Sequence, residues 1–94
     1  MPERFWIAEI QISAEMEDKI RSRRFVTGAE VREACVPNAY ETASWHNDPT
    51  HGRRLIVYGR TAQGRRLKII LQPIDVHEGI WRLRTVVPAR QDGP

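Results

Sequence analysis

Arginine, lysine and tyrosine recur at alternate positions between residues 53 and 87, where they could bind a phosphate backbone. Guanidinium groups bind phosphate oxygens in a bidentate manner, and a tyrosine ring can stack on a base. The candidate nucleic-acid ligands are Arg54, Tyr58, Arg60, Arg66, Lys68, Arg82 and Arg84. Any single arginine of this set could equally be a solvated residue of a half-exposed sheet. Simple solvation explains the whole set less well, because like charges on neighbouring strands repel each other and their grouping on one face costs free energy.

Three titratable side chains lie close together in the sequence, at His46, Asp48 and His51. Such a group could carry protons or hold a metal ion. A loop without a third defined ligand rarely binds zinc, so we expect no metal and no cofactor. Because histidine titrates near neutral pH, His46 and His51 are the candidate general acid and base, chosen by elimination. His77 is expected to be solvated in a turn.

The cysteine and the tryptophans are expected in the interior. Cys35 is the single cysteine of the chain, so it forms no internal disulfide, and its place on an apolar helix stripe predicts a small buried side chain. Trp6, Trp45 and Trp81 more often fill a core than bind a ligand. We therefore assign these four residues to the core rather than to a site.

The basic residues need a sheet to position them, and the stretch from 53 to 87 predicts a meander of three antiparallel strands. Apolar and polar residues alternate in it, with two breaks at turn-forming residues. A three-residue loop, Ala62-Gln63-Gly64, sets residue 57 opposite 69 and residue 59 opposite 67, which joins the two apolar faces. If Thr61 were a fourth loop residue, the register would slip by one residue, and Ile56 and Tyr58 would lie opposite the apolar residues of the next strand instead. We prefer the first register. The predicted buried face consists of Leu55, Val57, Gly59, Leu67, Ile69, Leu71, Trp81, Leu83, Thr85 and Val87.

Two short helices are predicted before the meander. Ser13 can cap a helix over residues 14–24, in which acids come first and arginines last, as the helix dipole favours. The apolar stripe of this helix is so thin that it must lie on a surface, held by one face. Thr27 and Glu30 have the spacing of a capping box that begins a second helix over 28–36.

Two further strands complete the predicted sheet. Alternation predicts one over residues 5–12 and another over 39–45, with Ala43 and Trp45 facing inward, followed by a polar loop over 46–52. Residues 88–94 are expected to be a frayed tail. The chain, 1–94, is then a single α+β domain of order β-α-α-β-β-β-β. Its two helices pack on one face of an antiparallel sheet and leave the basic face open.

Charge is divided unevenly along the chain. The 94 residues are 40% hydrophobic and 29% charged, as in an ordinary globular domain. Residues 1–50 hold six bases against nine acids, a net charge of −3, whereas residues 51–94 hold nine bases against three acids, a net charge of +6. This asymmetry suggests an anionic partner, with nucleic acid first and an acidic protein segment second. The preference for arginine over lysine suits phosphate binding, although GC-rich coding would also produce it.

Nothing in the sequence directs the chain to a membrane. The longest apolar runs are only a few residues, and no secretory signal is visible at the N-terminus. We therefore expect a cytoplasmic protein without a membrane partner.

Three segments of the chain resemble a known family. They are DKIRSRRFVTGAEVREA at 18–34, GRRLIVYGRTAQGRRLKIIL at 52–71 and WRLRTVV at 81–87, and they resemble the small BrnT-type toxins and their relatives in the RelE/ParE superfamily. The family's second-helix start matches Val26 and Glu30-Val31, its hairpin matches Gly59-Arg60-Thr61 with Gly64-Arg65, and its last strand matches Arg82 and Thr85.

Some positions depart from the family's pattern. Its Lys-His-Gly turn is Arg23-Arg24-Phe25 here, so an arginine stands where the family has a histidine. Its final arginine is Val87, although Arg84 and Arg90 lie near enough in the sequence to take over a phosphate contact. These departures concern catalysis rather than the fold.

The resemblance implies a RelE-like fold and a bacterial toxin-antitoxin system, in which the toxin is a metal-independent endoribonuclease neutralised by a cognate antitoxin protein. Such enzymes let a ribose 2′-hydroxyl attack the adjacent phosphate, so the protein must align RNA, stabilise charge and move protons. The catalytic candidates are Arg60, Arg82, Arg84, His46 and His51. The alternative is a non-catalytic module of the same fold that binds nucleic acid or protein. An exposed edge at residues 5–12 also makes a homodimer plausible.

Overall fold

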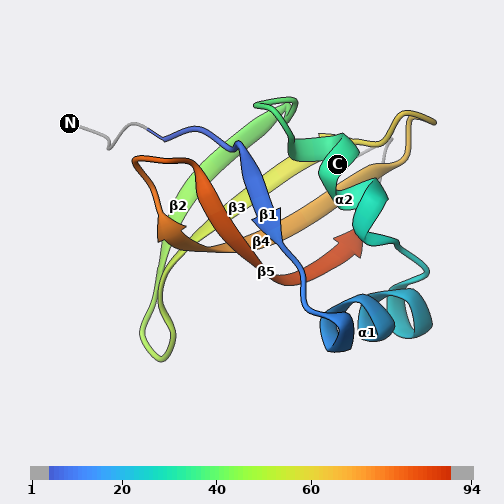
Figure 1. The fold of residues 1–94 in the computed structure, drawn as a ribbon, viewed down its shortest axis with the longest axis horizontal. Coiled ribbons are helices and arrows are strands. Elements are labelled where there is room, and N and C mark those ends of the chain that lie inside the picture. The colour runs from blue at the N-terminus through green and yellow to red at the C-terminus, as the bar shows by residue number, and fades with distance from the viewer. Residues whose placement is uncertain (1–4, 90–94) are drawn as a thin grey trace.

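A computed structural model describes residues 5–89 as two helices and a five-stranded sheet (Figure 1). In chain order the elements are β1 (Glu9–Gln11), α1 (Ala14–Arg24), α2 (Gly28–Cys35), β2 (Thr42–Asp48), β3 (Gly52–Arg60), β4 (Arg66–Asp75) and β5 (Ile80–Pro88). The predicted α+β class is confirmed, and the elements follow one another in the predicted order.

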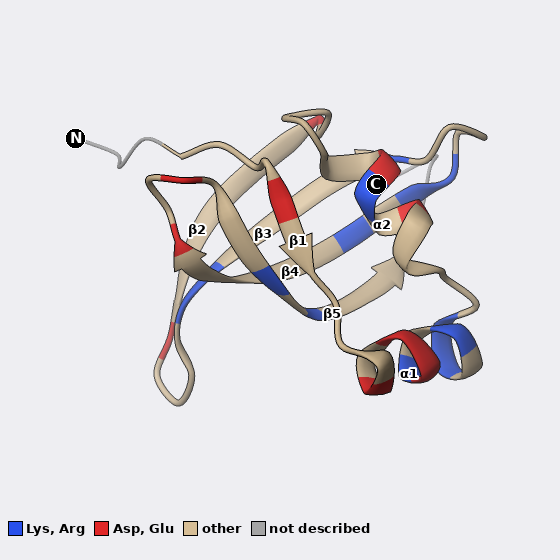
Figure 2. Ribbon diagram, viewed as in Figure 1, with Lys and Arg blue, Asp and Glu red and all other residues tan. Residues whose placement is uncertain are grey.

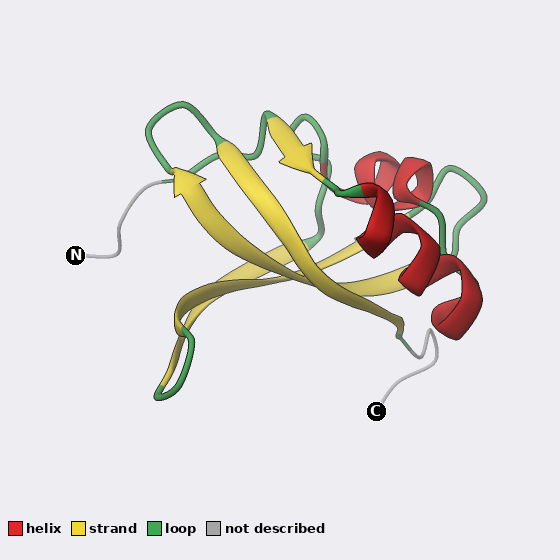
Figure 3. Ribbon diagram, turned by 60° about the horizontal axis from the view of Figure 1, so that its bottom comes forward, coloured by secondary structure: helices red, strands yellow, loops and turns green. Residues whose placement is uncertain are grey.

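The sheet is mixed, so the prediction of a purely antiparallel sheet was wrong. Its strands lie in the order β1-β5-β4-β3-β2, and the pairs from β2 to β5 are antiparallel, but β1 is parallel to β5. A hairpin forces its two strands to run antiparallel, whereas β1 leaves the sheet through two helices and has no hairpin to its neighbour. Both helices lie toward one end of the strongly twisted sheet (Figure 3).

Both predicted helix starts are confirmed. Ser13 caps α1 by accepting a hydrogen bond from a backbone N–H of the first turn, and Thr27 with Glu30 forms the capping box of α2. As its thin apolar stripe predicts, α1 buries little of its surface. The buried helix residues, Ile20 of α1 and Val31, Ala34 and Cys35 of α2, belong to the same core cluster as the inward-facing residues of the sheet.

The register of the β3–β4 hairpin is the predicted one. Val57 pairs with Ile69 and Gly59 pairs with Leu67, and Gly64 takes the left-handed conformation (φ 88°) that ends the loop. Gly59 lies directly beneath α2, where a β-carbon would overlap the carbonyl oxygen of Ala34. The glycine therefore lets the helix approach the sheet closely.

A bulge at Arg84 overturns part of the predicted face of β5. Leu83 pairs with Leu71, but Thr85 pairs with Ile70, so the β5 strand contains one extra residue between these pairs. The inward positions after the bulge are shifted by one. Val86 is consequently buried, whereas Thr85 and Val87, both predicted to face inward, are paired with outward-facing residues of β4.

β1 is shorter than the predicted strand over residues 5–12. The N–H groups of Ala8 and Glu9 both donate to the carbonyl of Gly79, at 2.9 and 3.0 Å, and Ile7 exchanges hydrogen bonds with Asn38. The N–H groups of residues 7–9 are thus hydrogen-bonded to Gly79 and Asn38, which lie in turns, and not to a neighbouring strand as expected. The alternation expected of a strand also fails here, because Ile7 and Ile10 are both buried although they are three positions apart.

β2 begins and ends later than predicted. It spans Thr42–Asp48 instead of 39–45, and the predicted loop over 46–52 shrinks to a turn at 49–51. The Asp48 carboxylate makes this turn by accepting hydrogen bonds from the N–H groups of Thr50 and His51, at 2.7 and 2.9 Å. Ala43 and Trp45 pack against the core, as predicted.

The three tryptophans differ in burial. Trp81 is fully buried, and Trp45 is partly buried against the core, as expected. Trp6 is 42% exposed, so the expectation that it fills the core was wrong. Its ring lies over the β4–β5 turn, where Nε1 donates a 2.9 Å hydrogen bond to the carbonyl of His77.

The end of the chain is described as far as Ala89. Pro88 belongs to β5, and the Ala89 N–H donates a 2.9 Å hydrogen bond to the carbonyl of Arg66, so the expected fraying does not begin at residue 88. The rest of the expected tail, residues 90–94, lies outside the described residues. Within residues 5–89, neither helix is long and apolar enough to cross a membrane.

Candidate nucleic-acid interface

The sheet face that points away from the core, here the open face, carries polar side chains across all five strands. Register pairs Arg82 with both Gln11 and Gln72, and it pairs Arg54 with His46. Arg54 and Gln72 each lie one position beyond the end of the β3–β4 ladder, on neighbouring strands. We call Gln11, Arg82, Gln72, Arg54 and His46 the polar row. It crosses the strands, with about 5 Å between neighbouring strands.

Partly buried apolar and aromatic side chains fill the middle of the open face. Ile56 pairs with Ile70, and Tyr58 pairs with Lys68. Ile70 also pairs with Thr85, which the bulge has turned to this side. The Lys68 side chain makes no hydrogen bond or ion pair with another residue between 5 and 89. The open face thus presents an aromatic ring and apolar surface beside an uncompensated cation, a combination that suits bases and phosphates.

One corner of the open face is an ion-pair network that the sequence did not reveal. Arg60 and Arg66 are cross-strand partners, and both donate to the carboxylate of Glu41, at 3.0 and 3.2 Å. The hydrogen bond from Arg60 is the main cause that lowers the pKa of Glu41. Arg66 also lies over the ring of Tyr58, 4.9 Å from its centroid. Two predicted phosphate ligands therefore share one carboxylate, which offsets half of their charge.

Arg54 lies on the open face as predicted but is not the exposed ligand that was expected. It is only 8% exposed. Its Nη1 atom is buried and has no hydrogen-bond partner among the described residues. A buried guanidinium nitrogen without a partner is costly, so this position favours an anion or an acceptor group that would complete it.

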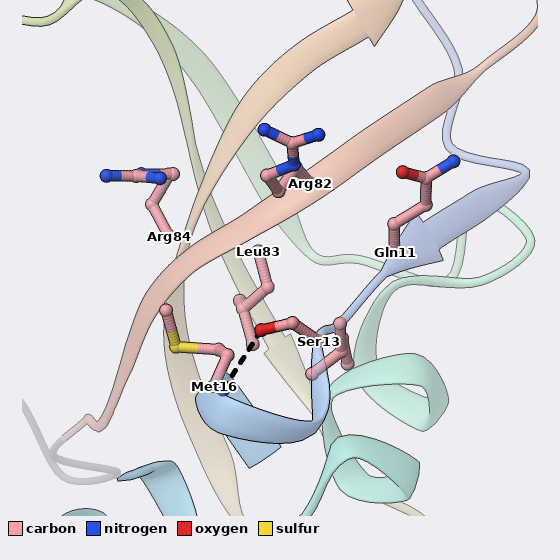
Figure 4. Close-up of a pocket in the computed structure, with 7 residues that line it drawn as sticks. Gln11, Ser13, Met16, Arg82, Leu83 and Arg84 are labelled. Carbon is pink, nitrogen blue, oxygen red and sulfur yellow. Dashed lines mark hydrogen bonds between the residues drawn. The ribbon is translucent and has the colours of Figure 1, made fainter.

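Arg82 and Arg84 lie beside a hollow that sequence reasoning missed. The hollow has a volume of about 410 Å³ and is lined by Gln11, Ile12, Ser13, Met16, Arg82, Leu83 and Arg84. Figure 4 shows Leu83 turned towards α1, whereas Arg82 and Arg84 project from the other side of β5. Neither arginine side chain makes a hydrogen bond or ion pair with another described residue. The sequence feature that could have predicted this hollow is the helix cap at Ser13. Because the chain enters α1 there, β1 ends at Gln11 and the part of β5 after Arg82 has no neighbouring strand on that side.

The two candidate proton-transfer residues lie apart. His46 is exposed on β2 beside Arg54, within the polar row. His51 lies in the β2–β3 turn, where its Nδ1 is 3.4 Å from the Asp48 carboxylate. Arg60 stands at the opposite end of β3, roughly 25–30 Å from the turn at 3.3 Å per residue. The structure thus places His46 and Arg82 in one row but does not bring His51 or Arg60 to it.

No group of three or more histidine, cysteine, aspartate or glutamate side chains within the described part of the chain has a geometry that could hold a metal ion. His77 is exposed in the β4–β5 turn, where solvation was expected.

Comparisons with protein-family models, curated proteins and solved structures found no significant match to this chain. The resemblance to BrnT-type toxins accordingly stays a prediction from the segments at 18–34, 52–71 and 81–87.

Proposed function

We propose that this protein binds single-stranded RNA on its open face. The observation that carries the proposal is the set of uncompensated cations on the open face, with Lys68 beside Tyr58 on the neighbouring strand and Arg82 and Arg84 on β5. Cations without carboxylate partners gain most from phosphates, and each contact releases counterions from the nucleic acid. Successive bases can stack on Tyr58 or rest on the apolar pair of Ile56 and Ile70.

The biological class that we propose is a toxin of the BrnT and RelE/ParE kind, acting in the cytoplasm and held inactive by a cognate antitoxin. The motif resemblance supports it, and the order β-α-α-β-β-β-β with β1 beside β5 is compatible with the RelE-like fold that the resemblance implies. An acidic antitoxin segment on the open face would compete with RNA, because both would neutralise the same cations.

RNA cleavage is a second candidate function, favoured by the position of His46 beside Arg54 in the polar row. A neutral imidazole there would take the proton of a ribose 2′-hydroxyl while the oxygen attacks the adjacent phosphorus. Arginines of the row would stabilise the charge on the phosphoryl oxygens. The bond from phosphorus to the 5′-oxygen then breaks, which leaves a 2′,3′-cyclic phosphate and, after proton transfer to the leaving oxygen, a 5′-hydroxyl.

Binding is tested by fluorescence anisotropy of the purified protein with a labelled oligouridine at several salt concentrations. We expect the logarithm of the association constant to fall linearly with the logarithm of salt, and Lys68→Gln to reduce the slope by about 0.7, the value for one phosphate contact on a single strand. Arg21→Gln is the matched control, because it removes the same charge from a residue already paired with Glu17 at 2.7 Å. Binding that is absent at low salt, or flat as salt rises, would contradict the proposal.

Cleavage is tested separately by separating the same oligonucleotide on a gel after incubation. A cleaving protein should yield cyclic-phosphate ends, and His46→Gln should abolish them while anisotropy stays unchanged. Intact RNA with the wild-type protein would exclude cleavage and leave the binding function in place.

A further inference from the structure

A second basic surface lies between α1 and β5, beyond the open face. The hollow beside Arg82 adjoins a smaller one of about 50 Å³, and the two share Met16 and Arg84 in their walls. The smaller hollow is lined by Met16, Lys19, Ile20, Arg23, Arg24, Arg84 and Thr85. We call the two together the α1–β5 groove. It exists because β1 pairs with β5 only as far as Arg82.

The charge of this groove is strongly positive. Its charged side chains are Lys19, Arg23, Arg24, Arg82 and Arg84, and none of the residues lining either hollow is acidic. None of these five side chains makes an ion pair with another described residue. Figure 2 shows the cause along α1, where the acidic residues lie in the first turns and the basic residues in the last. The acids Glu15 and Asp18 line a neighbouring hollow, which shares Lys19 and Arg23 with the groove, but they form no ion pair with either residue.

An exposed aromatic ring stands at the basic end of α1. Phe25 is 78% exposed and occupies the left-handed region at φ 57°, where a residue with a side chain is rarely found. Arg65 holds this turn from the hairpin, because its Nη1 donates a 2.6 Å hydrogen bond to the carbonyl of Phe25 and its Nη2 donates a 3.4 Å bond to the carbonyl of Arg24. Arg65 thus holds the backbone of a turn that exposes a large apolar ring to solvent, directly after two uncompensated arginines.

We propose that an RNA strand bound on the open face continues past Arg84 into the α1–β5 groove and ends with a base stacked on Phe25. This inference rests on the proposed RNA binding and extends it to α1. Arg84 lines both hollows and lies on β5, so it connects the sheet to the groove. Arg23 and Arg24 supply phosphate contacts at the far end, and Phe25 supplies a sequence-tolerant stacking surface of the kind that single-strand-binding proteins use.

Single-stranded RNA fits these features better than an acidic peptide does. Carboxylates and phosphates would both satisfy the arginines, but the exposed ring beside them offers a stacking surface that the bases of RNA can use and carboxylates cannot. Four of the five cations are arginines, whose planar groups also stack on bases. We therefore commit to RNA, and an acidic peptide is an outcome of the test.

The test measures the affinity of labelled oligouridine for variants of the full chain. Phe25→Gly should weaken binding by at least about fivefold, the lower range for loss of one stacked base, whereas Phe25→Trp should preserve binding. Phe25→Gly should also fold at least as stably as wild type, because glycine adopts positive φ without strain, so weaker binding would not reflect unfolding. Arg23→Gln should reduce the salt slope by about 0.7 and Arg21→Gln, two residues away, should not.

The outcomes separate the groove from the open face. If Lys68→Gln weakens RNA binding while Phe25→Gly and Arg23→Gln leave it unchanged, the groove is not on the RNA path although the open face is. If wild type does not bind RNA at all, both proposals fall. A labelled polyglutamate peptide forms the last arm: loss of peptide binding in Arg23→Gln, with RNA binding unchanged, would assign the groove to an acidic protein partner and overturn the inference.

Discussion

The carboxylate of Glu17 on α1 accepts a 2.9 Å hydrogen bond from the backbone N–H of Gly28, the first residue of α2. The same oxygen accepts a 2.7 Å bond from Arg21 on its own helix. A β-carbon at position 28 would overlap this carboxylate, so a larger residue there would displace the Glu17 side chain. One acidic side chain thus ties a helix with a thin apolar stripe to a helix that belongs to the core.

Glu17→Gln should therefore loosen α1 more than its surface position suggests. The amide oxygen keeps a neutral hydrogen bond to Gly28 but loses the charge-assisted bonds, so we expect the free energy of unfolding to fall by about 1–2 kcal/mol. Urea unfolding followed by circular dichroism measures this change. Glu15→Gln is the control, because Glu15 is exposed in the same turn, and a loss as large as that of Glu17→Gln would refute the specific role of Glu17.

Acid should destabilise the fold, because it protonates carboxylates that accept hydrogen bonds from arginines. The pKa of Glu17 is lowered from its ordinary value of 4.5, first by the Arg21 hydrogen bond, and the pKa of Glu41 is lowered from 4.5, first by the Arg60 hydrogen bond. Depressed pKa values mean that the folded state prefers the ionised form. The stabilisation is complete above pH 4.5 and is lost as pH falls through the lower folded-state values.

Urea midpoints measured between about pH 7 and pH 3 test this sign. They should stay nearly constant down to about pH 5 and then fall. The fall should be smaller in Glu17→Gln, which has no carboxyl at this position to protonate. Midpoints that rise below pH 4.5 would contradict the assignment.

The closeness of α2 to the sheet can be tested at Gly59. A methyl group on this residue would overlap the carbonyl oxygen of Ala34, and neither backbone can move without disturbing the core. We expect Gly59→Ala to lower the free energy of unfolding by about 2–4 kcal/mol, in the range of overpacked cores. Ser44→Ala on the exposed side of β2 is the control, with an expected change within about 0.5 kcal/mol. A Gly59→Ala variant as stable as wild type would show that the helix is free to shift.

Local signals in the sequence predicted the parts of the fold that local chemistry decides. The caps at Ser13 and Thr27 depend on side chains within three residues, and the β3–β4 register depends on one loop and two matching apolar faces. The bulge at Arg84 is different, because Leu83, Thr85 and Val87 alternate as an undisturbed strand would. Only the partner residues of β4 decide where the extra residue goes.

The candidate site was predictable in composition but not in arrangement. Alternation placed the basic residues on one face, yet nothing in the sequence joined Glu41 to Arg60 and Arg66, because that contact depends on β2 lying beside β3. The α1–β5 groove was missed for a similar reason. It depends on β1 ending at Gln11, just before the Ser13 cap, and on β5 lying beside both β1 and α1, an arrangement that no local pattern shows.

The thiol of Cys35 should be inert in the folded protein. It is fully buried on α2, and burial raises its pKa to about 12, so the reactive thiolate is scarce at neutral pH. Ellman's reagent should therefore release no colour from native protein and one equivalent after unfolding in guanidinium. A Ser44→Cys variant, with an exposed thiol, gives the reference rate. Native Cys35 that reacts as fast as this reference would show that α2 opens readily.

The buried guanidinium of Arg54 should lower the free energy of unfolding and strengthen the binding of anions. Its Nη1 atom has no described partner, and a buried donor without a partner costs about 1–3 kcal/mol. Arg54→Met keeps most of the volume without the charge, so the free energy of unfolding should rise by about 1–3 kcal/mol while oligouridine binding weakens. Inorganic phosphate should raise the melting temperature of wild type more than that of Arg54→Met, because the variant lacks the Arg54 guanidinium and keeps only the other cations. Arg53→Met is the control on the neighbouring position, where the guanidinium lies 3.8 Å from the centroid of the Trp45 ring on the other face. If Arg54→Met is less stable than wild type and phosphate affects both equally, Arg54 is a packing residue and the polar row is not an anion site.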